Sequence, residues 1–442
     1  MKKIVFIVLS AVMVLFSATY VYGDVSIDLV GETAVLIDGA TGEVLYDKDM
    51  HRQMYPASTT KVMTAILALE NCELNEIVTI DAETPFTEGS RIYLLEGEQI
   101  TVEQLLYALL LESANDAAVA LAKHISGDVE KFAALMNEKA IQLGAMNTNF
   151  VNPNGLPNEK HVTTAYDLAM IARYAMKNQK FREIVSTSDV YHIPATGIQD
   201  DRYFRIGNRL LWDTKKTLLY NGNYIAPKYE YATGVKTGYT VAAGSCLIAS
   251  AKKDGREVIS VVLKSDPNNL YLDSIKLLDH GLNDYKNITL VKKGEIKGDT
   301  AIKGGETDAL EAAVSQDIIK TVPSDYDEAL IETKVDISEE VTAPVIAGDI
   351  IGNISIYYNG ILWGQTNLVA AQNVDESMIA AAVIKTGNFF SSLKTAFIIV
   401  VILAIGYMVF VISSNINRKK RRRIRKEKYK LDSDYFYRNI LK

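Results

Sequence analysis

The sequence predicts an α+β domain whose antiparallel sheet is covered by helices, then a small all-β domain and a C-terminal transmembrane helix. Up to about residue 285, helical and strand-like segments are mixed without the regular strand–helix–strand order of a parallel sheet. After residue 286, short strand-like runs separated by glycine-rich turns replace the helical pattern. Residues 396–412 contain no charge, and a strongly basic run follows them. At 442 residues the chain is long enough for two or three domains.

The first domain is predicted to span residues 24–285 and to begin with a hairpin. Residues 34–38 and 43–46 are apolar runs joined by a glycine-rich turn. Thr101 and Gln104 have the spacing of a capping box, so a helix is expected from 101 to 110. A strand is predicted at 77–80, and a helix is predicted to begin near Ser58. Further helices are predicted at 117–124, 129–143, 164–176 and 270–282.

Three runs near the end of this domain are predicted to be neighbouring antiparallel strands. They cover 234–240, 245–251 and 258–263, and a Lys-Asp-Gly turn joins the last two. The second domain, predicted over 286–375, shows no candidate catalytic cluster. Its five strand-like runs cover 289–293, 317–322, 331–335, 349–358 and 361–370.

Charge is distributed unevenly along the chain. The formal net charge is −7, but residues 414–442 hold 12 Lys/Arg and 3 Asp/Glu, and residues 1–23 add two lysines. When the +9 and +2 of the two ends are removed from the total of −7, residues 24–413 carry −18. A body this acidic has no basic stripe for a phosphate backbone, so nucleic acid is not an expected partner.

The two ends predict a membrane protein. Residues 1–23 have the plan of a secretory signal peptide, although an uncleaved signal anchor fits the same pattern. Residues 395–413 are uncharged and about long enough to span a bilayer as one transmembrane helix, and a connector at 376–394 precedes them. The basic tail 414–442 then predicts a cytoplasmic C-terminus and an extracytoplasmic body at a cell membrane.

Ser58 and Lys61 are the first candidate catalytic pair. On a helix they lie on one face, one turn apart, and a lysine whose pKa is lowered can take the proton of a serine nucleophile. The same Ser-x-x-Lys spacing also occurs at 250–253 and 391–394, so the pair alone favours a helix cap beside a solvated lysine over a catalytic pair.

Two further motifs follow in the same domain. Ser113-Ala114-Asn115 is predicted in a loop between helices, and Lys236-Thr237-Gly238 on a strand. Other copies of these short motifs lie after residue 384, close to the predicted membrane span, where no pocket can form around them. The first set therefore forms the candidate site.

The three motifs, in this order, resemble the active site of the penicillin-binding proteins and serine β-lactamases. The resemblance covers about residues 30–285 and is closest to the low-molecular-mass D-alanyl-D-alanine carboxypeptidases. Residues 348–371 resemble the β-rich domain that follows in that family. The longer phrases that carry the resemblance are Pro56–Lys61, Ser113–Ala118, Asn152–Leu156 and Gly234–Thr240. The resemblance implies a serine carboxypeptidase that removes D-alanine from peptidoglycan stem peptides and binds β-lactam antibiotics covalently.

The acylating residues have expected roles that follow from their chemistry. Ser58 attacks the acyl carbonyl, and Lys61 accepts its proton while the charge of Lys236 keeps that lysine partly neutral. Ser113 relays the proton to the leaving amine, and Asn115 holds a substrate amide. Water then hydrolyses the ester.

The substrate is expected to bind along Lys236, Thr237, Gly238 and Tyr239. The family resemblance implies that the backbone N–H groups of Ser58 and Tyr239 form an oxyanion hole. Lys236 and Thr237 are expected to receive the substrate carboxylate. No metal or cofactor is expected, because the histidines form no ligand-spaced set and are interpreted as structural or surface residues; they are His51, His124, His161, His192 and His280.

One position departs from the family pattern. Many of these carboxypeptidases resemble one another in an arginine that faces the substrate carboxylate, and here Leu270 takes its place. No arginine occurs between Arg256 and Arg418. Lys264 is the remaining nearby cation that could assist Lys236 and Thr237.

Alternative functions fit parts of the sequence. A D,D-endopeptidase would use the same motifs on an internal bond, and a non-catalytic wall-sensing protein would only bind peptides or β-lactams. A β-lactamase-like hydrolase needs a deacylating glutamate in a Glu-x-x-Leu-Asn phrase, which is absent between Ser113 and Lys236. Cys72 and Cys246 could form one disulfide, but their apolar contexts predict two buried free thiols.

Overall fold

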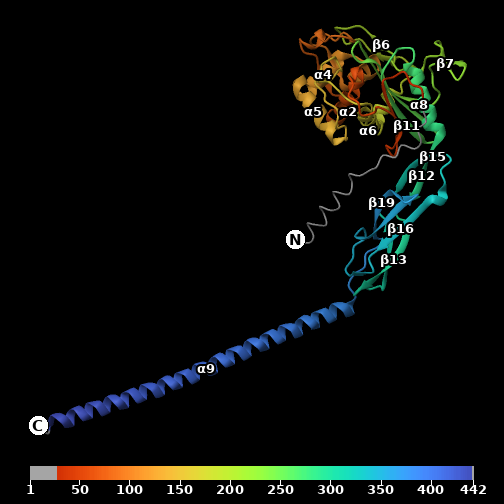
Figure 1. Cartoon of the computed structure of the whole chain (residues 1–442). Coiled ribbons are helices and arrows are strands. Elements are labelled where there is room, and N and C mark those ends of the chain that lie inside the picture. The colour runs from red at the N-terminus through yellow and green to blue at the C-terminus, as the bar shows by residue number, and fades with distance from the viewer. Residues whose placement is uncertain (1–26, 441–442) are drawn as a thin grey trace. The chain divides into compact units, whose positions relative to one another are not determined.

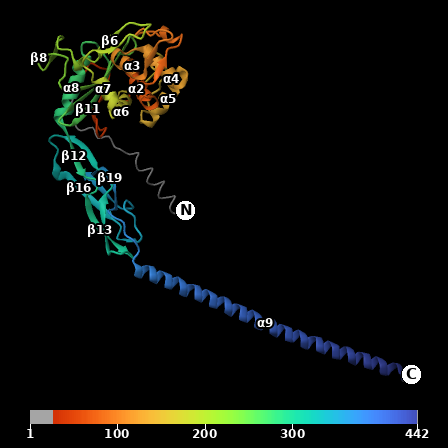
Figure 2. The same ribbon diagram turned by 180° about the vertical axis from the view of Figure 1, so that it is seen from behind.

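The computed structural model describes residues 27–440, with side chains described except at 379–392 and 431–440 (Figure 1 and Figure 2). The described chain divides into two compact units. The first runs to Leu290 and takes in Ile319–Ala329, and the second consists of Val291–Ile318 and the chain from Leu330 onward. The predicted signal peptide at 1–23 lies outside the described residues.

The first unit is built on a five-stranded antiparallel sheet. The order of its strands is β2–β1–β11–β10–β9. Their bounds are β1 (Thr33–Asp38), β2 (Val44–Lys48), β9 (Ala232–Thr240), β10 (Gly244–Lys253) and β11 (Arg256–Ser265). The prediction of an N-terminal hairpin and of three neighbouring late strands is confirmed. Strand β1 pairs with β11, and this pairing joins the N-terminal hairpin to the three late strands. It places Val35 opposite Val261.

Helix α2 (Lys61–Asn71) is the centre of the helical part. Every residue from Lys61 to Ala68 is buried, so α2 has neighbours on all sides. The helices that contact it are α3 (Val102–Tyr107), α4 (Asn115–Ser126), α5 (Val129–Gln142), α6 (Ala165–Ala175) and α7 (Gln179–Val185).

The sheet is covered on both faces because its apolar side chains alternate between them. Leu36 and Val262 belong to the cluster that packs on α8 (Leu270–Asp284). Val35 and Val261 belong to the larger cluster formed with the other helices. Figures 1 and 2 show α8 on one side of β11 and α2 and α6 on the other. The predicted architecture of an antiparallel sheet covered by helices is confirmed.

Helix α3 begins at the predicted capping box and ends differently from the prediction. The Gln104 N–H donates to Thr101 Oγ1 at 3.1 Å, and the Thr101 N–H donates to Gln104 Oε1 at 3.0 Å. The regular helix expected to residue 110 changes after Tyr107 into a π-helical turn, η4 (Ala108–Glu112). Such turns are frequent at functional sites, and this one delivers the chain to Ser113.

Short elements complete the first unit. Residues 185–230, whose pattern gave no clear prediction, contain three-residue strands and a 3₁₀ turn. The short elements are β3 (Ile77–Thr79), η3 (Thr84–Phe86), β4 (Gln99–Thr101), β5 (Tyr191–Ile193), β6 (Arg202–Phe204), η5 (Arg209–Leu211), β7 (Leu218–Tyr220) and β8 (Asn223–Ile225).

The second unit contains a six-stranded sheet in the order β16–β18–β19–β14–β13–β17. The strands are β13 (Ile296–Lys303), β14 (Ala309–Val314), β16 (Ile331–Ile337), β17 (Glu340–Thr342), β18 (Ile350–Tyr358) and β19 (Ile361–Ala370). The sequence predicted β16, β18 and β19 but missed the other three. Alanine-rich β14 and polar β13 have weak strand propensity, and pairing with neighbours overrides it. Two more predicted strands, β12 (Tyr285–Val291) and β15 (Ile318–Pro323), pair in a separate two-stranded sheet, most of which belongs to the first unit. The turn η6 (Glu328–Leu330) follows β15.

The C-terminal region is one helix, α9 (Met378–Ile440). It runs without a break through residues 378–440, which include most of the predicted connector, the whole predicted membrane span and the described part of the basic tail. Within residues 27–440, its segment Leu393–Lys430 is the one helix long and apolar enough to cross a membrane.

Both cysteines are free thiols. Cys246 is buried, as expected, but Cys72 is partly exposed. The expectation of two buried thiols is therefore wrong for Cys72, because the chain at the end of α2 reaches the surface.

Candidate active site

Ser58 lies on the 3₁₀ turn η2 (Ala57–Thr60), which leads directly into α2. Ala57 has a φ of +48°, which is uncommon for a residue with a side chain. Gly155 packs against the same peptide, since a Cβ added to Gly155 would lie 1.9 Å from the Ala57 carbonyl oxygen. The backbone at the nucleophile is therefore strained and closely packed, which fixes the position of the hydroxyl.

Lys61 is the first residue of α2 and is fully buried. Its Nζ donates to Ser58 Oγ at 3.0 Å, to Asn115 Oδ1 at 2.6 Å and to the Asn154 backbone oxygen at 2.6 Å. Burial lowers the pKa of Lys61 well below that of a free lysine, and the charge of Lys236 lowers this pKa further. An amine in this position can be neutral and accept the serine proton.

The second motif lies where η4 passes into α4. Ser113 adopts a left-handed conformation with φ 62° and ψ 32°, and Asn115 starts α4. The Asn115 carboxamide accepts from Lys61 through Oδ1 and donates from Nδ2 to the Glu88 backbone oxygen at 2.6 Å. One Nδ2 proton remains for a substrate amide, because a carboxamide nitrogen carries two.

The third motif lies on β9, and its lysine is buried. Lys236 is 2% exposed, and its Nζ donates to the Thr237 backbone oxygen at 2.8 Å. Burial lowers the pKa of Lys236 to about 7, although the Glu112 carboxylate raises it. Lys236 therefore loses its proton more easily than an exposed lysine does.

Strand β9 runs close to the nucleophile turn. A Cβ added to Gly238 would lie 3.0 Å from the Ser58 backbone nitrogen, so the absence of a side chain permits this approach. Tyr239 is 64% exposed. The Tyr239 side chain is thus open to solvent, while its backbone is paired in the ladder opposite Ser245.

The structure brings the predicted residues together to different degrees. Ser58, Lys61 and Asn115 are joined by hydrogen bonds, and Lys236 acts on Lys61 through its charge. Among the described residues, Ser113 is not hydrogen-bonded to any of these four.

Two groups near the site were not assigned a catalytic role from the sequence. The Asn154 backbone carbonyl accepts a hydrogen bond from Lys61. The turn signal at 152–155 is the sequence feature that could have indicated this contact. His161 supports the same helix start, because its Nδ1 accepts the Val151 N–H at 3.1 Å and its Nε2 therefore donates to Thr60 Oγ1 at 2.8 Å. Burial lowers the pKa of His161 to about 4, so this imidazole is neutral.

Leu270 is 4% exposed and belongs to the apolar cluster under α8. The chain at Gly207, which is distant from Leu270 in the sequence, passes close to β9. A Cβ added to Gly207 would lie 3.0 Å from Thr237 Oγ1. The neighbouring Arg209 guanidinium stacks 5.6 Å from the centre of the Tyr271 ring. Arg209 lies far from Tyr271 along the chain, so spacing in the sequence did not indicate this contact.

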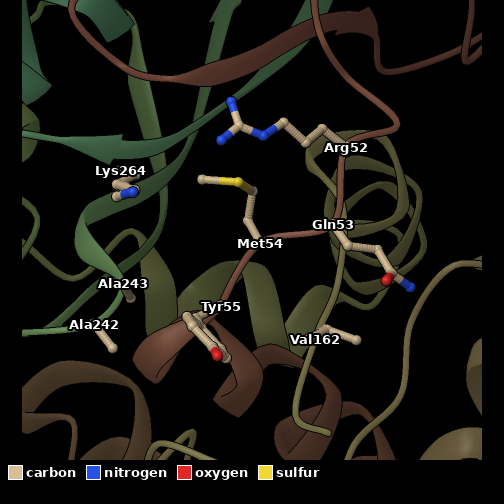
Figure 3. A pocket seen from close by; sticks show the side chains of 8 residues that line it. All are labelled: Arg52, Gln53, Met54, Tyr55, Val162, Ala242, Ala243 and Lys264. Carbon is tan, nitrogen blue, oxygen red and sulfur yellow. The ribbon is translucent and has the colours of Figure 1, made fainter. Parts of the chain in front are cut away.

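Lys264 lines a separate pocket of about 360 Å³ (Figure 3). The side chains of Arg52 and Met54 extend towards Lys264 in this pocket (Figure 3). Both cations pair with Glu32, at 2.8 Å from Lys264 and 3.0 Å from Arg52. The aliphatic part of the Lys264 side chain lies next to Gly244, which follows the Tyr239 end of β9. Among the residues described, Lys264 is not hydrogen-bonded to Lys236 or Thr237. Its expected help with the carboxylate therefore has no support in these contacts.

Comparison with known proteins agrees with this geometry. Residues 23–267 match the family described as D-alanyl-D-alanine carboxypeptidase, and residues 285–376 match the C-terminal domain of penicillin-binding protein 5. The chain belongs to the D-alanyl-D-alanine carboxypeptidase family. The Bacillus subtilis D-alanyl-D-alanine carboxypeptidase DacF is 31% identical over 352 residues, which cover 78% of this chain and 86% of the relative.

Solved structures of relatives share the fold. The D-alanyl-D-alanine carboxypeptidase DacD from Francisella tularensis is 29% identical with a TM-score of 0.59, and the match covers 83% of this chain and 98% of that one. A variant of the Streptomyces K15 DD-transpeptidase is 31% identical with a TM-score of 0.52, covering 58% of this chain and 98% of that one. The family resemblance found in the motifs is confirmed.

Proposed function

We propose that the chain is a serine-type D-Ala-D-Ala carboxypeptidase that removes the terminal D-alanine from peptidoglycan stem peptides through an acyl-enzyme on Ser58. The observation that carries this proposal is the buried Lys61 amine, whose Nζ lies at hydrogen-bond distance, 3.0 Å, from Ser58 Oγ. Membership of the family supports the substrate class.

Acylation starts with proton transfer from Ser58 Oγ to the neutral Lys61 Nζ. The hydroxyl oxygen attacks the carbonyl of the penultimate D-alanine, and the negative charge develops on the carbonyl oxygen. The backbone N–H groups of Ser58 and Tyr239 receive that oxygen, and the contact of Gly238 with the Ser58 backbone supports this arrangement. Losing one such donor typically costs about 10²–10³ in rate.

Expulsion of the terminal D-alanine requires a proton for its amine. Ser113 passes that proton from Lys61 to the leaving nitrogen, and the C–N bond breaks. Lys236 and Thr237 hold the carboxylate of the leaving residue, while Asn115 holds an amide of the stem peptide through its remaining N–H. Water then attacks the Ser58 ester, with Lys61 as base, and releases the shortened peptide.

The same acylation applies to β-lactams. Attack of Ser58 on the lactam carbonyl opens the ring, and the amine stays tethered to the acyl group. The product is a penicilloyl ester of Ser58, which gives a direct covalent test of the nucleophile.

The test uses the full chain in detergent. Wild type should release D-alanine from a D-Ala-D-Ala peptide and form a penicillin adduct on the tryptic peptide containing Ser58. Ser58→Ala should do neither, whereas Ser250→Ala, which changes the serine of a second Ser-x-x-Lys match on β10, should retain both. D-Alanine release by a folded Ser58→Ala protein would disprove the proposal.

A D,D-endopeptidase or transpeptidase is the second candidate activity. The burial of Leu270 leaves the carboxylate of a free C-terminus without a cation at that position, and one structural relative is titled a DD-transpeptidase. Turnover of a free-ended peptide compared with a cross-linked one separates the two activities. A carboxypeptidase prefers the free end.

We propose that α9 anchors the protein in a cell membrane with the first unit outside and the basic tail in the cytoplasm. The apolar segment and the basic run that follows it support this topology. In a variant whose two native cysteines are replaced by serine, a cysteine introduced at Ser414 should be protected from an impermeant thiol reagent on intact cells, and one introduced at Ser186 should be labelled. The reverse pattern would contradict the topology.

A further inference from the structure

Three potential metal ligands from separate parts of the first unit come together away from the active site. Cys72 follows the last residue of α2, Glu76 lies just before β3, and His124 lies in the last turn of α4. The cysteine sulfur, a carboxylate oxygen and a ring nitrogen all lie within 4.8 Å of one another. From the sequence His124 was interpreted as a structural or surface residue, because Cys72 and Glu76 are distant along the chain and the histidines form no ligand-spaced set.

The distances are close to those of a coordination shell. Ligand atoms around tetrahedral Zn²⁺ are about 3.5 Å apart, given metal–ligand bonds of about 2.0–2.3 Å. His124 Nε2 already lies 3.0 Å from Glu76 Oε1. Side-chain rotations alone could bring the three donor atoms around one ion. Thiolate, imidazole and carboxylate are also the donor types that zinc takes.

The backbone at these ligands is held by hydrogen bonds. The Cys72 N–H donates to the Ala68 carbonyl at 3.1 Å, and the Glu76 N–H donates to the Glu73 carbonyl at 3.1 Å. The Glu76 carbonyl accepts the Val102 N–H at 3.0 Å. A preformed backbone lowers the ordering cost of binding, because only side chains need to move.

There is also room for a fourth ligand. A surface hollow of about 460 Å³ is lined by Cys72 and Glu76, with Glu73, Asn178 and Lys180 around them. A water molecule can complete a tetrahedron from this side. Zinc binds a cysteine as the thiolate, so binding must release the thiol proton of Cys72.

We propose that Cys72, Glu76 and His124 bind one divalent cation of the zinc class as a structural site. The ion joins the C-terminal ends of α2 and α4, whose N-terminal ends carry Lys61 and Asn115. It lies about 16 Å from Lys61, the length of the 11-residue helix α2, and takes no part in the peptidase chemistry. Its effect is to stabilise the packing of the two helices that position the catalytic residues.

The test measures cobalt and zinc binding by the purified full chain in detergent after chelator treatment. Cobalt should bind at one equivalent per chain and produce a thiolate-to-cobalt charge-transfer band, and zinc should displace it. Zinc should also raise the thermal unfolding temperature. Cys72→Ser should abolish the band, and His124→Gln should weaken binding at least about tenfold.

The matched control is His192→Gln. His192 also pairs with a carboxylate, Asp201 at 2.9 Å, but has no thiol beside it in the described structure. This variant should bind cobalt as wild type does. Absence of the band in wild type, less than one equivalent at saturation, or equal binding by wild type and both ligand variants would each overturn the proposal. Unfolding curves without metal show that the variants are folded, and none of these readouts depends on peptidase activity.

Discussion

Replacing Lys61 with arginine would retain a cation beside Ser58 and remove the proposed base. Arginine has a pKa above about 12 and stays protonated over the pH range of the assay, so it cannot take the Ser58 proton. A positioned general base typically contributes about 10²–10⁴ in rate, or about 3–5.5 kcal/mol in barrier height. Because Lys61 Nζ is 3.0 Å from Ser58 Oγ, we expect the acylation rate constant to fall by at least about 100-fold.

The assay is acylation by a fluorescent penicillin, followed over time at several pH values. In wild type the rate should rise with pH and level off once Lys61 has lost its proton. Burial and Lys236 lower the pKa of Lys61, so the plateau should begin well below the usual lysine range. The arginine variant should show no such rise.

Lys131→Arg is the control for the same chemical change at the surface, where Lys131 pairs with Asp128 at 2.6 Å. Thermal unfolding of both variants checks that the larger arginine is accommodated in the fully buried Lys61 position. A folded Lys61→Arg protein that is acylated within about threefold of the wild-type rate, with the same pH profile, would refute the assignment of Lys61 as base.

Two further changes test the surroundings of the pair. Lys236→Gln removes a charge that lowers the pKa of Lys61, so the rising limb of the acylation profile should move to higher pH, and an unchanged or lower limb would count against this coupling. Gly155→Ala should lower the unfolding free energy by about 1–3 kcal/mol and slow acylation, because its Cβ would lie 1.9 Å from the Ala57 oxygen at a φ of +85°. Gly197→Ala has nearly the same φ, +86°, but no atom within 4 Å, so it should show the backbone strain without the loss of acylation. Denaturant unfolding and penicillin labelling measure both effects, and equal acylation by the two alanine variants would contradict the role of the Gly155 contact.

Local sequence signals predicted much of the first unit. The Thr101–Gln104 capping box, the N-terminal hairpin and the late strands β9 to β11 depend on residues that are close together in the chain. The π-helical turn before Ser113 was missed because its hydrogen-bond shift has no marker among the apolar residues of 108–111. Strands β13 and β14 were missed because their pairing with each other and with β17 and β19 outweighs weak propensity.

The sequence by itself determined the three ordered motifs, a helix that begins near Ser58 and Lys61, and the apolar and basic segments near the C-terminus. Each of these follows from short-range spacing or composition. Only the tertiary structure decided that Lys61 is fully buried and bonded to the Asn154 carbonyl, 93 residues away. It also placed Leu270 in the core and His124 beside Cys72. Desolvation and hydrogen bonding depend on which distant residues fill the surrounding space, and spacing along the chain does not contain that information.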